Sequence, residues 1–549
     1  MQGLMMDTPL LITDLIRFAD RNHGDTEIVS KTAEGAGKDG TGAVHRYTYR
    51  EAHARARRLA KVLQALGVKP SDRVGTLAWN GYRHYELYYA ISGIGAVINT
   101  INPRLFPDQI AYISNHAENT ALFFDLTFVP LVEKLAPQLK SVKHYVLMTD
   151  RAHMPAQTSI PKLLCYEELM EKQDERFEWP TFDERTAAAL CYTSGTTGNP
   201  KGVLYGHRST ILHAYGAALP DALDLSAHDA VLPVVPMFHA NAWSLPYACT
   251  MVGAKMVFPG PHLDGKSVYE LIEQEKVTMS AGVPTVWLML LQHLAANKVK
   301  FSTLKRTVIG GSACPPAMIR AFQEEYGVTV FHAWGMTEMS PLGTVGSLKA
   351  RQAALPKEEQ RAVQAKQGRG IFGVEMKIVD EEGKELPWDG KRFGNLLVKG
   401  PWISSGYMKG EGGDILRDGW FPTGDVATID PDGYMQITDR SKDVIKSGGE
   451  WISSIDLENI AVAHPAIQEA AVIGIRHPKW DERPLVVAVK KAGQEVTREA
   501  LLKFYEGKIA KWWMPDDVVF VPELPHTATG KLSKLTLRQQ FQDYRLPGA

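Results

Sequence analysis

The sequence contains few cysteines, and their spacing excludes two kinds of site. Cys165, Cys191, Cys249 and Cys314 are the only cysteines in 549 residues, and no two of them form a C-x-x-C pair. This spacing argues against a cysteine zinc site, and a disulfide framework is not expected in so large a chain. We therefore expect all four to be buried as small apolar side chains.

A long apolar run is also missing. The most apolar stretch, residues 86–100, is interrupted by Ser92, Gly93 and Gly95 and is too short to cross a bilayer. The first residues of the chain lack the basic patch, apolar segment and cleavage site of a secretory signal. These absences predict a cytoplasmic protein with no transmembrane segment.

The chain has no large excess of charge of either sign. Its 61 basic and 62 acidic residues give a net charge of −1. Because a nucleic-acid-binding protein usually carries a broad basic surface, nucleic acid is not a predicted partner. Apolar residues make up 44% of the chain and charged residues 22%, which is typical of a globular protein. The length predicts more than one domain.

Helical and strand patterns alternate through the first 370 residues or so, which predicts an α/β fold with layered, largely parallel sheets. Strands are expected at 73–79, 121–125, 144–148, 188–193, 230–235, 254–258 and 306–309. Helices are expected at 51–66, 267–276, 285–295 and 316–326. Residues 31–43 are rich in glycine and predict a mobile surface loop.

Short strands separated by Gly, Asp and Pro follow at 375–379, 395–399 and 434–438. A smaller α+β region comes next, with strands near 470–475, 485–489 and 518–521 around a helix at 498–511. We predict an N-terminal domain over 1–438, a hinge at 439–442 and a C-terminal domain over 443–549.

The segment Tyr192–Gly202 reads Y-T-S-G-T-T-G-N-P-K-G and follows an apolar strand. Its glycines allow a tight turn that points backbone N–H groups inward, and hydroxyls and Lys201 add donors that suit a polyphosphate. The segment lacks the Gly-Lys-[Ser/Thr] of a Walker A loop, which disfavours a P-loop ATPase. The structural alternative is a glycine-rich surface turn.

This loop resembles the signature of the adenylate-forming superfamily, which includes acyl-CoA synthetases, luciferases and peptide-synthetase adenylation domains. Further motifs that resemble the family follow in order at 236–243, 334–338, 422–425, 439–440 and 525–531. The resemblance implies a large N-terminal domain of layered α/β sheets and a small, mobile α+β C-terminal domain. It also implies a two-step ligase, which forms an acyl-adenylate and pyrophosphate from an acid and ATP, and then transfers the acyl group to coenzyme A.

The resemblance assigns catalysis to Lys531, which would bridge the acid and the α-phosphate, with His239, Glu338 and Thr193. Thr193 and Glu338 would hold Mg²⁺, Asp425 and Arg440 would bind the ribose, and Trp334 would stack on adenine. The full ATP-binding set is Thr193, Ser194, Gly195, Thr196, Thr197, Gly198, Lys201, Trp334, Gly335, Met336, Thr337, Asp425, Arg440 and Lys531. In isolation Lys531 would read as an exposed lysine and Asp425 as a turn cap.

The acyl group is assigned to His239, Trp243, Gly310, Gly311 and Pro341. A buried core histidine is the alternative for His239. Relatives that activate α-amino acids carry an Asp in this region, whereas residues 238–241 contain no carboxylate, so the resemblance implies a plain carboxylic acid as substrate.

Coenzyme A is assigned to Lys446, Gly448, Gly449, Glu450 and Trp451, and the hinge to Asp439. The two glycines have a β-turn as their structural alternative. Because the chain ends without a carrier-protein domain, free CoA is the expected acyl acceptor.

Within the family, the chain is most similar to the medium- to long-chain fatty acid–CoA ligases, a branch that includes 3-methylmercaptopropionate–CoA ligases. The resemblance implies a short- or medium-chain fatty acid or 3-methylmercaptopropionate as substrate, and a homodimer. The alternatives are a long-chain ligase, a luciferase-like oxidative relative, a carrier-protein loader and a non-catalytic binding protein.

Overall fold

The computed structural model describes residues 1, 3–34, 43–193, 199–448, 450–526 and 532–547. The described residues divide into two compact units, which we treat separately. The larger unit contains residues up to Thr193, Asn199–Glu375 and Lys399–Ile415, and the smaller unit contains Met376–Val398 and Leu416–Ala549. The hinge at 439–442 stays a prediction.

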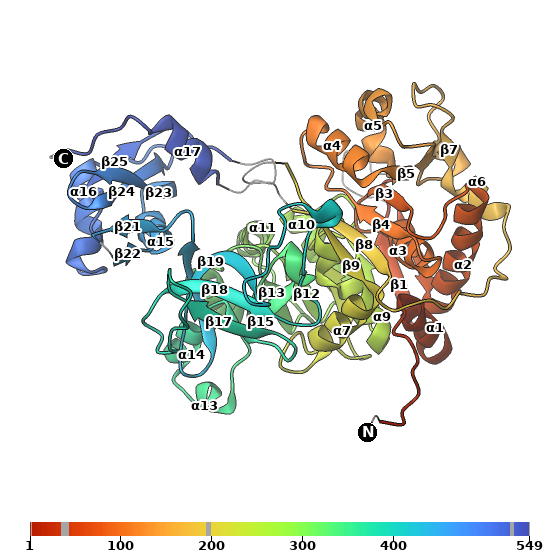
Figure 1. Cartoon of the computed structure of the whole chain (residues 1–549), viewed down its shortest axis with the longest axis horizontal. Helices are drawn as coiled ribbons and strands as arrows, with labels where there is room; N and C mark the ends of the chain where they lie inside the picture. The colour runs from red at the N-terminus through yellow and green to blue at the C-terminus, as the bar shows by residue number, and fades with distance from the viewer. Residues whose placement is uncertain (2, 35–42, 194–198, 449, 527–531, 548–549) are drawn as a thin grey trace. The chain divides into compact units, whose positions relative to one another are not determined.

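The first sheet of the larger unit is built mainly from parallel strands (Figure 1). In spatial order these are β7 (Leu164–Cys165), β6 (His144–Leu147), β5 (Asn119–Phe124), β3 (Arg73–Leu77), β4 (Val97–Thr100), β8 (Ala187–Tyr192) and β9 (Gly202–Gly206). Neighbouring strands run parallel except β8 and β9, which form an antiparallel pair.

Helices cover both faces of this sheet. Alternate residues face opposite sides: Phe123 packs in the cluster that includes α2 (Tyr49–Ala65) and α3 (Tyr82–Gly93), whereas Phe124 packs with α4 (Pro107–Ala117) and α5 (Val129–Leu135). Burial on both faces explains why these strands read as apolar runs in the sequence.

Helix α2 shows why a predicted helix forms where it does. Thr48 accepts a hydrogen bond from the backbone N–H of Glu51, and the Glu51 carboxylate accepts one from the backbone N–H of Thr48. This capping box satisfies two N–H groups that the first turn would leave without partners. Gly67, with φ +78°, follows the end of the helix in the left-handed conformation that glycine favours.

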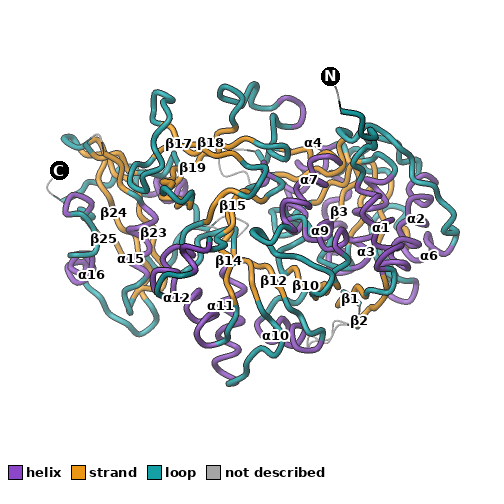
Figure 2. Tube along the Cα trace, turned by 90° about the horizontal axis from the view of Figure 1, so that it is seen from below, coloured by secondary structure: helices purple, strands orange, loops and turns teal. Residues whose placement is uncertain are grey.

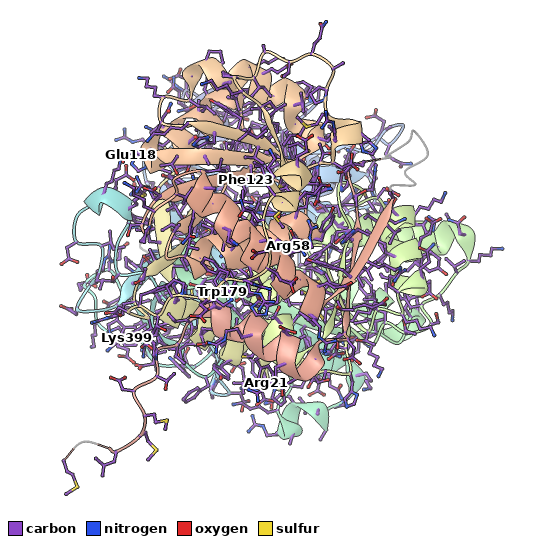
Figure 3. The ribbon with its side chains drawn as sticks, turned by 90° about the vertical axis from the view of Figure 1, so that its right-hand side faces the viewer. Arg21, Arg58, Glu118, Phe123, Trp179 and Lys399 are labelled. Carbon is purple, nitrogen blue, oxygen red and sulfur yellow. The ribbon has the colours of Figure 1, made fainter. Side chains whose placement is uncertain are left out.

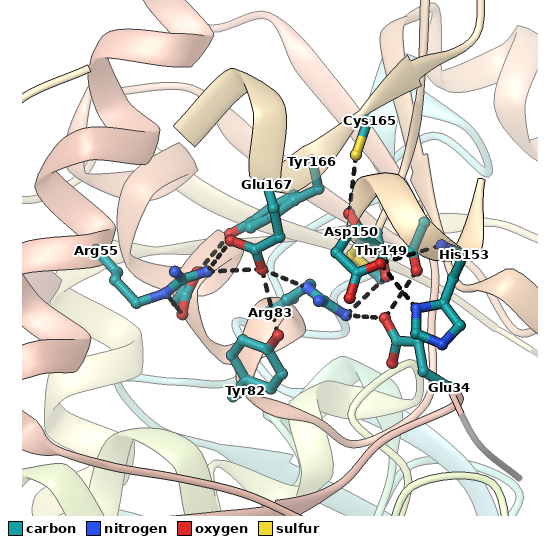
Figure 4. A network of polar contacts seen from close by, with 12 residues as sticks. Glu34, Arg55, Tyr82, Arg83, Thr149, Asp150, His153, Cys165, Tyr166 and Glu167 are labelled. Carbon is teal, nitrogen blue, oxygen red and sulfur yellow. Dashed lines mark hydrogen bonds and ion pairs between the residues drawn. The ribbon is translucent and has the colours of Figure 1, made fainter. Parts of the chain in front are cut away.

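Salt bridges tie α2 and α3 to α6 (Tyr166–Glu171), as Figure 4 shows. Glu167 accepts hydrogen bonds from Arg83 at 2.8 Å and from Arg55 at 3.0 Å. Arg83 also pairs with Glu34 at 2.6 Å, and Arg55 with the fully buried Glu86 at 2.6 Å. Removing one partner from such a buried network typically costs about 3–5 kcal/mol.

Trp179, labelled in Figure 3, contacts both α2 and α3. Its indole N–H donates to His53 Nε2 at 2.9 Å. A β-carbon on Gly93 would lie 2.4 Å from its Cζ3 atom, so α3 needs a glycine here to let the ring approach.

A second set of strands in the larger unit lies in the order β16 (Gly368–Gly370), β15 (Leu342–Val345), β14 (Thr329–Gly335), β13 (Arg306–Ile309), β12 (Met279–Gly282), β10 (Ala230–Pro233), β11 (Lys255–Phe258), β1 (Glu27–Lys31) and β2 (Val44–Thr48). The strands from β14 to β1 are parallel. Figure 2 shows α10 (Gly265–Gln274) and α11 (Pro284–Asn297) beside them, and both helices pack in the same apolar cluster as Leu232 and Ile309.

The smaller unit contains an antiparallel meander and a separate C-terminal sheet. The meander consists of β17 (Glu375–Val379), β18 (Gly394–Lys399), β19 (Phe421–Ile429) and β20 (Tyr434–Arg440). The C-terminal sheet consists of β21 (Ile445–Ser447), β22 (Glu450–Ile452), β23 (Ile467–His477), β24 (Asp481–Lys490) and β25 (Asp517–Phe520). Helices α15 (Ser454–Val462) and α16 (Arg498–Tyr505) pack on one face, and α17 (Lys534–Gln540) packs on the other.

The remaining helices of four residues or more are α1 (Ile12–His23), α7 (His207–Ala218), α8 (Ala240–Trp243), α9 (Leu245–Val252), α12 (Pro316–Arg320) with a π-helical turn at Ala321–Glu325, α13 (Ala350–Ala353) and α14 (Lys357–Gln364). Among the described residues, none of the helices combines the length and the hydropathy needed to cross a membrane.

Most predicted elements are confirmed, including β13 and β17 with the bounds expected from the sequence. The four cysteines are buried and free, as predicted. The helix predicted to reach residue 511 is wrong in length, because α16 ends at Tyr505 and Gly507 follows with φ +74°. The glycine-rich loop predicted at 31–43 lies mostly outside the described residues.

Candidate active site

The two ends of the glycine-rich loop are paired with each other. Tyr192, the last residue of β8, is opposite Gly202, the first residue of β9. The Thr193 N–H donates to the Lys201 carbonyl at 3.0 Å, and the Lys201 N–H donates to Thr193 Oγ1 at 3.1 Å. The loop residues Ser194–Gly198 lie outside the described residues. A β-hairpin therefore presents the loop and fixes Thr193 beside Lys201.

Tyr407 connects this hairpin to Glu338. The Lys201 ammonium lies 4.9 Å from the centre of the Tyr407 ring, and the Tyr407 hydroxyl donates to Glu338 Oε1 at 2.8 Å. Burial and the adjacent Glu338 raise the pKa of Tyr407, so its hydroxyl remains a donor at neutral pH. The structure thus brings Thr193, Lys201 and Glu338 together through a residue that the sequence interpretation missed.

The motif 334–338 forms a tight connection between β14 and β15. A β-carbon on Gly335 would lie 2.0 Å from the Pro341 carbonyl oxygen, so glycine is required there. The Met336 N–H donates to that same carbonyl at 3.1 Å. The Tyr205 hydroxyl donates to the Thr337 carbonyl at 2.5 Å. The motif therefore holds the Glu338 backbone in place, and Glu338 itself is buried.

Trp334 packs over a second glycine. Its Cζ3 atom lies 2.7 Å from the point where a β-carbon on Gly343 would stand. The side chain is largely buried, at 8% exposed. Its predicted stacking on adenine stays a prediction, as does the acyl contact of Pro341, which lies beside Gly335.

The segment after His239 has an unusual backbone. Residues 240 to 244 all have positive φ, between 43° and 65°, although none is glycine. Asn241 is buried, and its Oδ1 atom accepts from the Tyr88 hydroxyl and from the Cys191 thiol, each at 3.4 Å. The left-handed conformation costs roughly 1–2 kcal/mol per residue, so the surrounding packing must hold this turn in place.

This left-handed turn places Trp243 against the predicted acyl wall. The Trp243 Cη2 atom lies 3.0 Å from the β-carbon position of Gly310, and the Ala333 carbonyl oxygen lies 2.9 Å from the same point. Gly311 has φ +80° and lies near Val283. His239 is half-buried and precedes the turn, so it is not a fully buried core histidine. The structure brings Trp243 and Gly310 together, as the interpretation of an acyl wall requires.

The predicted ribose pair is together in the smaller unit. Asp425 in β19 is opposite Arg440 in β20, and Arg440 Nη1 donates to Asp425 Oδ1 at 2.5 Å. The Asp425 side chain is 6% exposed and that of Arg440 is 45% exposed. Gly424 precedes Asp425 with φ +73°, and the Asp425 N–H donates to Thr423 Oγ1 at 3.0 Å. A buried carboxylate is therefore presented beside a partly exposed guanidinium.

Asp439, the predicted hinge residue, lies in β20, and its buried carboxylate faces the start of α15. Its Oδ2 atom accepts from the Ser454 N–H at 2.7 Å, and its Oδ1 atom accepts from the Arg440 N–H at 2.8 Å. Burial raises the pKa of Asp439, although the nearby Lys534 opposes the shift.

Two of the predicted CoA residues face each other across the β21–β22 hairpin. Lys446 is opposite Trp451, with its ammonium 5.9 Å from the ring centre, and it also forms an ion pair with Glu381. Gly448 has φ +61°, and its β-carbon position is 2.9 Å from the Trp480 ring. The structure thus gives Gly448 a role in the β-turn, which was the alternative to CoA binding, because the hairpin itself needs glycine there. Gly449, the Glu450 side chain and Lys531 lie outside what the structure describes.

Family comparisons cover most of the chain. The family described as AMP-binding enzyme matches residues 17–408, and the AMP-binding enzyme C-terminal domain matches residues 456–531. The chain belongs to the AMP-binding enzyme family. The first match spans the hairpin loop, Glu338 and Trp243, and the second begins within α15 and ends at Lys531.

Individual members of the AMP-binding enzyme family match nearly the whole chain. The chain is 56% identical over 543 residues to the 3-methylmercaptopropionyl-CoA ligase of Ruegeria lacuscaerulensis, covering 99% of each chain. It is 50% identical to the medium-chain-fatty-acid–CoA ligase of Ectopseudomonas oleovorans, covering 100% of this chain and 98% of that one. Its structure is similar to that of the anthranilate CoA ligase AuaEII in complex with anthranoyl-AMP, with a TM-score of 0.83, 25% identity and 99% of each chain covered.

These findings confirm three predictions made from the sequence motifs. They confirm the adenylate-forming α/β fold, the branch of the family that the chain resembles, and an AMP-forming acyl-CoA ligase that uses ATP and coenzyme A. The roles of the individual site residues remain predictions.

Proposed function

We propose that this ligase activates 3-methylmercaptopropionate or a fatty acid of short to medium chain length. The observation that carries the proposal is the 56% identity, over 99% of both chains, to a ligase named for 3-methylmercaptopropionate. The 50% identity to a medium-chain ligase keeps fatty acids of comparable length as candidates. Trp243 supports an acid of limited length, because its ring fills space over Gly310.

Adenylation joins two anions, so this chain must supply positive charge and alignment. The acid's carboxylate attacks the α-phosphorus of ATP, and pyrophosphate leaves. We assign Lys531 to bridge the carboxylate and the α-phosphate, and we assign Lys201 and the loop hydroxyls to the leaving phosphates. Lys201 lies where the loop returns to the hairpin, beside Thr193, which suits this role.

A magnesium ion fits the oxygen donors beside the loop. Mg²⁺ is usually held by one or two protein oxygens together with phosphate and water. Glu338 supplies a carboxylate and Thr193 a hydroxyl, and Tyr407 and Lys201 link the two. When bound, the ion would neutralise phosphate charge.

The ribose would be held by Asp425, whose two oxygens can accept both ribose hydroxyls, with Arg440 beside it. Trp334 would stack on adenine. The acid would lie near His239 and Trp243, and since residues 238–241 offer no carboxylate, an α-amino group would lack a partner there.

The second step requires the CoA thiol to reach the acyl-adenylate. We propose that the C-terminal domain rotates about Asp439, so that Lys531 withdraws. Lys446, Gly448, Gly449, Glu450 and Trp451 would then line the path of the pantetheine arm, with free CoA as acceptor. We also propose a homodimer in the cytoplasm, and sedimentation of the purified enzyme would test the dimer.

The substrate is tested by measuring AMP release with CoA for straight-chain acids of rising length and for 3-methylmercaptopropionate. We expect the highest kcat/KM for the thioether acid or for a straight-chain acid of similar length. A clear preference for long-chain acids would favour the long-chain alternative. AMP release that needs oxygen instead of CoA would favour a luciferase-like enzyme, and a preference for a phosphopantetheinyl protein would favour a carrier-protein loader.

The assignment of Lys531 is tested by the variant Lys531→Ala. We expect loss of acid-dependent ATP–pyrophosphate exchange with CoA transfer from pre-made acyl-adenylate retained. Equal loss of both half-reactions would contradict the proposed rotation.

A further inference from the structure

A short segment of the larger unit, residues 404–412, contacts both the phosphate loop and the predicted metal ligand; we call it the 404–412 strap. The Ser404 N–H donates to the Glu338 backbone carbonyl at 2.7 Å. Three residues later, the Tyr407 hydroxyl donates to the Glu338 carboxylate at 2.8 Å. The strap therefore holds Glu338 at its backbone and at its side chain.

The other side of Tyr407 faces the loop. The Lys201 ammonium lies 4.9 Å from the centre of the Tyr407 ring, within the range of a cation–π contact. The ammonium also lies 3.4 Å from the β-carbon position of Gly412, the last residue of the strap. The Lys201 side chain therefore lies along the strap, while its backbone N–H is held by Thr193 Oγ1.

Further contacts anchor the strap to the first sheet. Lys409 pairs with Glu118 at 2.7 Å, and Glu411 pairs with His116 at 3.2 Å. His116 Nδ1 in turn lies 2.7 Å from the hydroxyl of Tyr192, the residue that precedes Thr193. Because the strap is tied at both ends, Tyr407 has little freedom to leave Glu338 or Lys201.

We propose that Tyr407 is a positioning residue for adenylation, because its hydroxyl orients the Glu338 carboxylate toward the metal while its ring receives the Lys201 ammonium. The proposal rests on the proposed function, in which Glu338 holds the metal and Lys201 binds phosphate. A hydroxyl that donates to one carboxylate oxygen would leave the other oxygen available to a metal ion, and groups that hydrogen-bond to metal ligands orient those ligands in this way. The contact with the Tyr407 ring separately fixes the position of the Lys201 ammonium.

Two substitutions separate these contributions. Tyr407→Phe removes the hydroxyl and keeps the ring, whereas Tyr407→Leu removes both. Tyr215→Phe, at an exposed tyrosine in α7, is the matched control. Binding is measured with the full-length enzyme, using electron paramagnetic resonance of Mn²⁺ with a non-hydrolysable ATP analogue. Affinity for the analogue is measured separately in EDTA.

For Tyr407→Phe we expect Mn²⁺ affinity about tenfold weaker, with affinity for the metal-free analogue unchanged. For Tyr407→Leu we expect the same loss for Mn²⁺ and a further loss of about threefold to tenfold for the metal-free analogue. In ATP–pyrophosphate exchange, the Phe variant should lower kcat without raising the KM for ATP. Tyr215→Phe should behave as the wild type.

Normal Mn²⁺ affinity in Tyr407→Phe would overturn the positioning role. Equal losses of metal and nucleotide binding in Phe and Leu, together with a lower unfolding temperature, would also overturn it and indicate a packing role. If Leu fails to fold, the Phe variant alone decides. The variant Glu338→Gln tests separately the premise that Glu338 holds the metal. Normal Mn²⁺ affinity in that variant would overturn the metal assignment itself.

Discussion

The Cη2 atom of Trp243 lies 3.0 Å from the point where a β-carbon on Gly310 would stand. An added methyl group at this distance would force the ring to move by a few tenths of an ångström, so the ring position and the absence of a side chain at residue 310 depend on each other. The glycine therefore allows the aromatic ring to pack closely against the segment predicted to form the acyl wall.

Replacing the ring should lengthen the pocket. We expect Trp243→Ala to move the optimum of kcat/KM toward longer straight-chain acids and to lower it about tenfold for the shortest, because a short acid loses its contact with the ring. Competition assays with pairs of acids would measure the change. Trp388→Ala, at a partly exposed tryptophan, is the control. An unchanged chain-length profile would place the acid elsewhere.

Filling the glycine should have a different effect. Gly310→Ala would place a methyl group 2.9 Å from the Ala333 carbonyl oxygen as well as against the ring. We expect activity to fall for every acid and the free energy of unfolding to fall by about 1–3 kcal/mol. In the double variant with Trp243→Ala, part of the loss should be recovered, and strict additivity of the two losses would argue that the ring and residue 310 are independent.

Asp425 and Arg440 should affect nucleotide binding to different degrees. We expect Asp425→Asn to raise the KM for ATP about tenfold or more, because a buried carboxylate makes stronger hydrogen bonds than an amide. Arg440→Gln should have a smaller effect, since this guanidinium is 45% exposed. The inhibition constant of AMP measures the loss of nucleotide affinity in each of the two variants. Arg392→Gln, in a surface pair with Asp389, should leave the KM unchanged.

Asp125 predicts a pH-dependent stability. Burial raises the pKa of Asp125 from 3.8 to about 7, and the backbone N–H of Trp79 donates to its carboxylate at 2.6 Å. Because the folded chain holds this proton more tightly than the unfolded chain, the carboxyl's contribution to stability falls as pH rises from about 4 to about 7, and it stays at its lowest value above that.

The variant Asp125→Asn removes the titration and keeps an acceptor. We expect its stability relative to the wild type to rise by about 3 kcal/mol between pH 5 and pH 8. Urea unfolding at the two pH values measures this change, with Asp7→Asn as the exposed control. A difference that is constant with pH would show that Asp125 does not titrate in this range.

Lys298 offers a stability prediction at a helix end. It follows α11 with φ 54° and ψ 38°, a conformation that glycine adopts without strain. We expect Lys298→Gly to raise the free energy of unfolding by about 1 kcal/mol. Lys300→Gly, an exposed position without positive φ, should be neutral or destabilising, and the urea midpoints of the two variants provide the comparison.

The elements best predicted from the sequence are those whose signal is local. Residues 306–309 read Arg-Thr-Val-Ile, and the three β-branched residues in succession favour a strand, which the structure buries along its whole length. The glycine-rich loop was placed correctly at the end of its first strand, because glycine spacing is a local property, whereas the strand β9 that follows it was not predicted. The predicted pair Asp425 and Arg440 was found through motifs that resemble a family.

Other features depend on contacts that no local pattern displays. Tyr407 meets a carboxylate 69 residues earlier in the chain, and a single tyrosine near glycines gives no sign of that partner. Residues 240–244 were not expected to be left-handed, because Ala and Trp rarely adopt positive φ and a run of five such residues without glycine is rarer still. The end of α16 was missed because the apolar pattern continued past Gly507, where the backbone turns.

The left-handed turn at residues 240–244 has a consequence for how such an enzyme diversifies. Five residues at roughly 1 kcal/mol each hold an amount of strain comparable to the whole net stability of many domains. A glycine in place of one of these residues would therefore relieve part of this strain, and so raise tolerance to destabilising changes elsewhere, while altering the predicted acyl wall. A change of acid and a gain in robustness could then arise from a single codon.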